Sequence, residues 1–133
     1  MIELSPEHIS RLIKEAKRAY PNEACGILAG GKDQRIEAVY PLTNIEPSSA
    51  TYFADPKEQV QVMKQLREEG REIVGIYHSH PDGEAYPSER DVELALWPDS
   101  FYLIISLKDM DEPVIKAFRI RKGKIKEEEI TST

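Results

Sequence analysis

The stretch GIYHSHPDGEAYPSERD, residues 75–91, places two of the three histidines of the chain two positions apart, at His78 and His80. The apolar run EIVGIY before them predicts a buried strand. Pro81 ends that strand, because proline has no N–H to donate to a sheet ladder. Alternate side chains of a strand lie on the same face, so both imidazoles point the same way from a strand end. Two such side chains can hold one metal ion between them.

Asp91 is the candidate third ligand, one turn into a short helix that Ser88 begins. Two histidines and one carboxylate with an open fourth position form the pattern of a catalytic zinc site. Ser88 and Asp91 also suit an ordinary helix start, with serine as the N-cap and an acidic residue in the first turn. A lone His-x-His on a surface strand is a weak signal as well. The joint occurrence of both patterns favours a metal site.

Glu23 is the candidate general base, because a hydrolytic metal site needs a group that takes a proton from water and passes it on. It immediately precedes the apolar run ACGILAG, where partial burial would raise the pKa of its carboxyl group. The chain has 24 acidic residues, so a solvated loop glutamate is the alternative interpretation.

The composition bounds the class of protein. Of 133 residues, 40% are hydrophobic and 32% charged, and the net charge is −6. We therefore expect a single domain over residues 1–133. A protein that binds nucleic acid usually has a basic surface, so the negative net charge argues against that class. No apolar run is long enough to span a membrane, so we expect no membrane protein. The N-terminus lacks the pattern of a signal peptide, and there is one cysteine, so a cytoplasmic location is expected.

The order of elements predicts a mixed α/β, or α+β, domain with a central mixed sheet flanked by helices. Ser5 and Pro6 begin one helix that Pro21 stops, and Asp55 and Gly70 bound a second. In the second helix, Val60, Met63 and Leu66 are expected to face inward. A third, short helix should run from Ser88 to about Leu96, and strands are expected over ACGILAGG, RIEAVYPLT, EIVGIY, SFYLIISL, PVIKAFRI and KIKEEEI.

These residues resemble the JAMM family of metalloproteases, also called MPN-plus domains. Its signature is a glutamate, then His-x-His-Pro, seven residues counted from that proline, and then Ser-x-x-Asp. Here it reads Glu23, His78-Ser79-His80-Pro81 and Ser88-Glu89-Arg90-Asp91, with no position missing. EACGILAG and YFADPKEQ are similar to the compact prokaryotic branch, so the resemblance covers most of the chain.

The resemblance implies a cytidine-deaminase-like layering and a zinc ion, Zn2+, bound by His78, His80 and Asp91. Glu23 would activate water and protonate the leaving amine, and Ser88 would donate a hydrogen bond to the oxyanion. The implied reaction is hydrolysis after the C-terminal glycine of a small ubiquitin-like β-grasp or sulfur-carrier protein with a Gly-Gly tail. The leaving group (lysine, cysteine or a peptide) and the oligomeric state remain open.

The substrate tail should lie extended in a narrow groove, held by pairing with a strand edge. Phe53 and Val60 are candidates for its wall, although core packing is the favoured role for both.

Two other classes compete with the metalloprotease. A non-catalytic MPN scaffold is the main alternative, since relatives without the metal ligands serve as assembly platforms. A thiol hydrolase using Cys25 is the second, although a cysteine within an apolar strand commonly behaves as a small hydrophobe. A zinc deaminase would need a Cys-x-x-Cys partner, which one cysteine does not supply.

Overall fold

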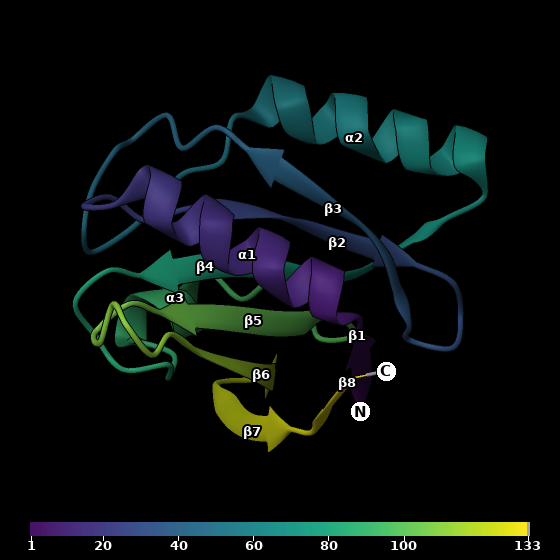
Figure 1. The fold of residues 1–133 in the computed structure, drawn as a ribbon. Coiled ribbons are helices and arrows are strands. Elements are labelled where there is room, and N and C mark those ends of the chain that lie inside the picture. The colour runs from purple at the N-terminus through teal and green to yellow at the C-terminus, as the bar shows by residue number, and fades with distance from the viewer. Residues whose placement is uncertain (133) are drawn as a thin grey trace.

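A computed structural model describes residues 1–132 and shows a six-stranded mixed sheet with helices on both faces (Figure 1). The strand order is β3-β2-β4-β5-β6-β7, and a separate parallel pair joins β1 to β8. The strands are β1 (Ile2–Leu4), β2 (Cys25–Gly30), β3 (Ile36–Leu42), β4 (Glu72–His80), β5 (Phe101–Ser106), β6 (Val114–Arg121), β7 (Lys124–Glu128) and β8 (Ile130–Ser132). The helices are α1 (Pro6–Ala19), α2 (Pro56–Glu69) and α3 (Glu89–Glu93). The predicted fold class is confirmed.

The strands β4 and β5 are parallel, while every other neighbouring pair of the large sheet is antiparallel. A parallel pair needs a crossover connection, and the segment that contains α3 provides it. The chain therefore leaves the end of β4 through residues 81–100 before it returns to start β5 beside it. This crossover puts Ser88 and Asp91 near the strand end that carries the histidines.

The helix α1 covers one face of the sheet. Ser5 accepts a hydrogen bond from the backbone N–H of His8 and Pro6 occupies the first turn, as the sequence predicts. Leu12 and Ala16 are fully buried in a cluster with Tyr77 of β4. Tyr77 therefore points to the α1 face, and its neighbours Ile76 and His78 point to the other face.

The opposite face carries α2, which Asp55 caps at its start and Gly70 ends with φ +71°. Leu66 is buried against Ile27 of β2, as predicted. Val60 is 65% exposed, so the prediction that it faces inward is wrong, whereas Met63 is 38% exposed and lines a cavity over this face of the sheet. The helix contacts the sheet through Val62 and Leu66, one turn apart, because it lies along the β3 side rather than over the sheet centre (Figure 1).

The third helix is shorter than predicted. It spans Glu89–Glu93 and ends at Leu94, because residues 94–97 leave the helical path and expose Leu96 and Trp97. At the other end of the sheet, Lys122 and Gly123 both have positive φ, as a two-residue hairpin turn between β6 and β7 requires.

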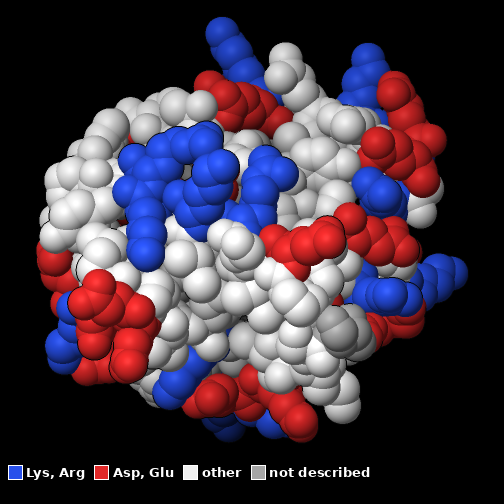
Figure 2. Space-filling model, viewed as in Figure 1, with Lys and Arg blue, Asp and Glu red and all other residues white. Residues whose placement is uncertain are grey.

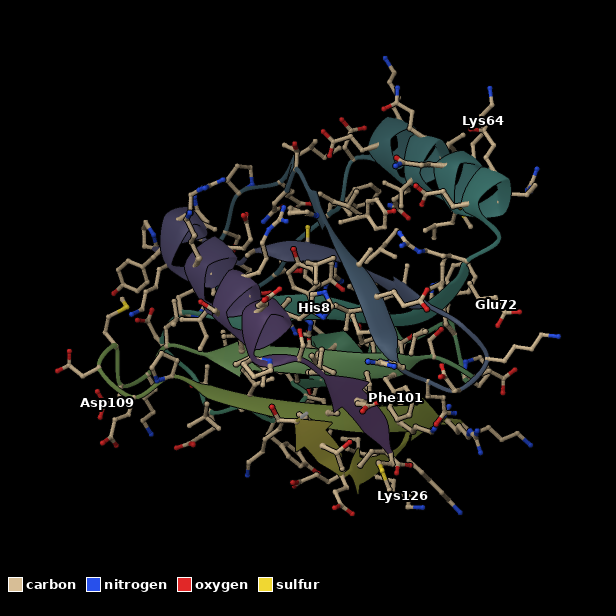
Figure 3. All side chains as sticks on the ribbon, turned by 45° about the vertical axis from the view of Figure 1, so that its right-hand side comes forward. His8, Lys64, Glu72, Phe101, Asp109 and Lys126 are labelled. Carbon is tan, nitrogen blue, oxygen red and sulfur yellow. The ribbon has the colours of Figure 1, made fainter. Side chains whose placement is uncertain are left out.

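Charged side chains are spread over the face of the molecule that Figure 2 shows. In Figure 2 basic and acidic groups lie side by side on the viewed face, in keeping with a net charge of −6 from 18 basic and 24 acidic residues. Figure 3 shows Lys64 on α2 and Asp109 in the β5–β6 turn pointing outward, while side chains fill the space between α1 and the sheet. None of the helices within residues 1–132 is long and apolar enough to cross a membrane.

Candidate metal centre

The end of β4 brings His78 and His80 onto the face that α2 and α3 cover. His78 pairs in register with Cys25 on β2 and with Ile104 on β5, so its side chain lies over the centre of the sheet. Both histidines are buried, with 2% and 9% of their surface exposed. Asp91, from the first turn of α3, is also buried at 8%. Three polar groups from two segments therefore meet in a place where water has little access.

Their ligand atoms converge on one point. The Nε2 atoms of His78 and His80 lie 3.1 Å apart, and both face Oδ2 of Asp91, at 3.1 Å and 3.0 Å. A tetrahedral zinc ion with bonds of about 2.0–2.2 Å requires ligand atoms roughly 3.3 Å or slightly more apart. The measured triangle fits such an ion after an outward movement of a few tenths of an ångström. These three residues are thus a group that can bind a metal ion.

The tautomer of His80 makes the group suited to a cation. Its Nδ1 lies 2.7 Å from the carbonyl oxygen of Glu84. A carbonyl oxygen only accepts, so Nδ1 carries the hydrogen and donates a hydrogen bond to that oxygen. In the neutral ring, Nε2 then presents a lone pair toward Asp91. A lone pair facing a carboxylate oxygen needs a positive charge between them, either a proton or a metal ion. The Glu84 carbonyl is an outer-sphere contact of the kind that orients metal-binding histidines.

The ring of His78 is oriented differently. Its Nδ1 is buried without a hydrogen-bond partner, and the ring of Tyr52 stacks on it with centroids 5.0 Å apart and planes at 27°. The stack fixes the plane of the imidazole, which keeps Nε2 pointed at Asp91. Tyr52 belongs to the loop that connects β3 to α2.

The side chain of Asp91 has two tasks. Its Oδ2 accepts a hydrogen bond of 2.9 Å from the backbone N–H of Ser88, and Ser88 Oγ accepts one of 3.1 Å from the N–H of Asp91. This reciprocal pair is a capping box, so the interpretation of the motif as a helix start is correct too. Burial alone would raise the pKa of Asp91, but hydrogen bonds from His78 and His80 hold it well below its usual range. Burial alone would lower the pKa of His80, and the bonds to Asp91 and Glu84 raise it instead.

Glu23 lies just before β2, whose first residue pairs with His78. It is 3% exposed, and burial raises the pKa of its carboxyl group to about 8, with the negative charge of Asp91 adding to the rise and His80 opposing it. The prediction of a desolvated glutamate is confirmed. Its Oε1 has no hydrogen-bond partner in the described part of the chain.

A cavity of about 180 Å³ opens beside the metal group on the same face of the sheet. Its lining includes Ile76 of β4, Tyr52, Phe53 and Trp97. Phe53 is 50% exposed, so its predicted core packing is wrong, as is that of Val60; the side chain of Phe53 lines the cavity instead. Cys25 also lines the cavity, and burial raises the pKa of its thiol to about 12, which disfavours the reactive thiolate.

The sequence pattern contains all five residues of the motif but gives no indication of the groups that hold them in place. These are Tyr52, the carbonyl of Glu84 and the side chains of Asn44 and Ser79, described below. Ser79 could have been singled out from the sequence, because it lies between the two histidines. Tyr52 and Asn44 lie in a loop with no recognisable sequence pattern.

Comparisons with known proteins agree with the motif. Residues 5–121 match the family model described as prokaryotic homologs of the JAB domain. The CysO-cysteine peptidase of Mycobacterium tuberculosis is 40% identical over 92% of this chain and 84% of its own. The desampylase of Haloferax volcanii is 44% identical over 65% of this chain and 63% of its own. A solution structure of a protein from Desulfitobacterium hafniense is 41% identical, covers 100% of this chain and 93% of that one, and superposes with a TM-score of 0.92.

The predicted resemblance to the JAMM family is therefore confirmed, since the match extends over all three helices and over the strands that carry the metal group. The chain belongs to the family of prokaryotic homologs of the JAB domain.

Proposed function

We propose that this protein is a zinc-dependent peptidase that cleaves the amide bond after the C-terminal glycine of a small ubiquitin-like β-grasp protein. The observation that carries the proposal is the convergence of His78, His80 and Asp91, three buried residues whose ligand atoms lie 3.0–3.1 Å apart. Two similar proteins are named CysO-cysteine peptidase and desampylase, which supports a peptidase of this kind.

His78, His80 and Asp91 would hold the zinc ion. When bound, zinc lowers the pKa of a coordinated water toward about 7, so that hydroxide is available at neutral pH. The nearby positive charge would also favour the ionised form of Glu23, which burial alone disfavours.

Glu23 would move the proton. Its carboxylate takes one proton from the attacking water as the water oxygen bonds to the scissile carbonyl carbon. The same carboxyl group then returns the proton to the amide nitrogen as the C–N bond breaks, giving a carboxylic acid and a free amine. Burial suits this double role, because a pKa near neutrality lets one group both accept and donate a proton.

Ser88 would stabilise the oxyanion that forms on the scissile carbonyl. Its Oγ already accepts a hydrogen bond from the N–H of Asp91, so the hydroxyl hydrogen stays free to donate. The capping box fixes the position of this hydroxyl at the start of α3, which pre-organises the donor.

The apolar cavity beside Ile76 would receive the substrate tail. A Gly-Gly tail has no side chains, so it fits an extended, narrow path along the sheet face toward His78.

Mass spectrometry of the products tests the proposal. The zinc-loaded protein is incubated with β-grasp proteins that end in Gly-Gly and are extended by cysteine, by a peptide or by a lysine-linked target. We expect cleavage after the second glycine, loss of cleavage with a chelator and recovery when zinc is restored. The identity of the released amine then decides between cysteine, peptide and lysine leaving groups.

Glu23→Gln is the matched control. It should keep about one zinc ion per chain and lower kcat by about 100–10,000-fold. A protein that binds no zinc and cleaves none of these substrates would contradict the proposal and favour a non-catalytic scaffold.

A further inference from the structure

Glu23 is held in place by its backbone rather than by its side chain. Its Oε1 is buried without a hydrogen-bond partner in the described structure, so no hydrogen bond to that atom fixes the carboxylate. The position of the carboxylate therefore depends on the two peptide groups on either side of its Cα atom. An error of 1 Å at a catalytic group can cost about 100-fold in rate.

Three hydrogen bonds anchor those peptide groups. The N–H of Glu23 donates to the carbonyl oxygen of Ser48 at 2.7 Å, and the carbonyl oxygen of Glu23 accepts from Nδ2 of Asn44 at 3.0 Å. The N–H of Ala24 donates to Oγ of Ser79 at 2.7 Å. Two of the three partners, Asn44 and Ser48, belong to one loop, residues 44–54, which we call the clasp loop.

Asn44 also holds the clasp loop closed. Its Oδ1 accepts from the N–H of Phe53 at 3.0 Å and from the N–H of Glu46 at 3.1 Å, and its backbone forms a bridge with Ala54. The same loop places the ring of Tyr52 on His78. One amide side chain therefore uses its acceptor to shape the loop and its donor to hold Glu23.

We infer that Asn44 is a positioning residue for Glu23: it fixes the orientation of the general base from the clasp loop, without contacting the reacting atoms. This inference rests on the proposed peptidase function. Both ends of the side chain are in use, so an aspartate of the same shape would keep the acceptor and lose the donor. Its oxygen would then face the carbonyl oxygen of Glu23, which pushes this peptide group away.

The test compares Asn44→Asp with Asn22→Asp. Asn22 precedes Glu23 in the chain, and none of the side-chain hydrogen bonds within residues 1–132 involves it, so its substitution introduces a similar charge near Glu23 without breaking a contact. We expect Asn44→Asp to lower kcat by about 10–100-fold with KM and zinc content unchanged, and Asn22→Asp to keep the kcat of the unmodified protein.

Hydrogen exchange gives a readout that does not depend on turnover. In Asn44→Asp the backbone N–H of Glu23, which bonds to the clasp loop, should exchange about 2–10-fold faster, whereas that of Leu103 in the core should not change. If Asn44→Asp does not fold, Asn44→Ser replaces it, because serine still accepts from the N–H two residues on but cannot reach Glu23.

The outcomes separate the two proposals. An unmodified protein that binds zinc and cleaves no β-grasp substrate refutes the proposed function. An active protein whose Asn44→Asp variant keeps the kcat and the Glu23 exchange rate of the Asn22→Asp variant refutes the role of Asn44 alone. A fall in kcat and a rise in KM of equal size would also overturn it, since a positioning residue away from the substrate leaves substrate binding intact.

Discussion

Replacing Glu23 with glutamine should change how the stability of the metal-free protein depends on pH. Burial raises the pKa of the Glu23 carboxyl from 4.5 to about 8. Between these values the folded protein keeps a proton that the unfolded chain releases, so the free energy of unfolding falls as the pH rises through this window. The full difference corresponds to about 5 kcal/mol, at about 1.4 kcal/mol per pKa unit.

Glutamine carries no ionisable proton, so the free energy of unfolding of the variant does not fall with pH for this reason. Its free energy of unfolding, relative to that of the unmodified protein, should gain at most about 1 kcal/mol at pH 5, about 3 kcal/mol at pH 7 and about 4 kcal/mol at pH 8. The prediction concerns how this difference in free energy changes with pH. Any effect of the buried amide that does not depend on pH adds the same amount at every pH and therefore cancels.

Urea unfolding at 25 °C in the presence of a chelator measures these free energies. Glu68→Gln is the control, since Glu68 is exposed on α2 and its carboxylate lies in water before and after unfolding. The change with pH measured for Glu23→Gln is compared with the change measured for this control. A flat difference for Glu23→Gln between about pH 5 and pH 8 would refute the argument that burial holds this carboxyl in its neutral form.

Three further substitutions test other parts of the structure. Ser88→Ala should lower kcat by about 100–1000-fold with zinc retained, because it removes the proposed oxyanion donor; an unchanged kcat would remove that role. Cys25→Ala should leave kcat unchanged, because burial raises the pKa of the thiol to about 12, and loss of turnover with zinc still bound would revive the thiol hypothesis. Gly26→Ala should lower the free energy of unfolding by about 1–3 kcal/mol in urea titrations, because the new Cβ would overlap the ring of Tyr77; equal stability would contradict the packing seen here.

The local elements were predictable because their signals are local. Ser5 with Pro6 and Asp55 with Gly70 bound the first two helices in the sequence and in the structure, since capping groups act within one turn. The strand that ends at His80 is also confirmed, because its apolar run and the proline after it lie in the same segment.

Long-range contacts could not be predicted in this way. The strands β1 and β8 each have three residues, and they pair only because the two ends of the chain meet, so neither has a periodic pattern of its own. The exposure of Val60 depends on how far α2 lies from the sheet centre, which no pattern within the helix encodes.

In the site, too, local features were predictable from the sequence and long-range contacts were not. The ligand triangle was predictable from the spacing of His78, His80 and Asp91, and a buried Glu23 from the apolar run that follows it. The contact that joins Glu23 to Asn44 spans 21 positions and depends on a loop fold, so the sequence gives no signal for it.

The shared oxygen of Asp91 has a practical consequence for anyone who wants a version of this protein without a cation. Because Oδ2 both faces the imidazoles and caps the N–H of Ser88, replacing Asp91 with a residue that has no side-chain acceptor, such as alanine, also loosens the first turn of α3 and the hydroxyl that it presents. A clean knockout must therefore be made at a histidine, where the helix start is left untouched. By the same logic, a relative that no longer binds a metal ion must keep a side-chain acceptor at position 91 or begin this helix in another way.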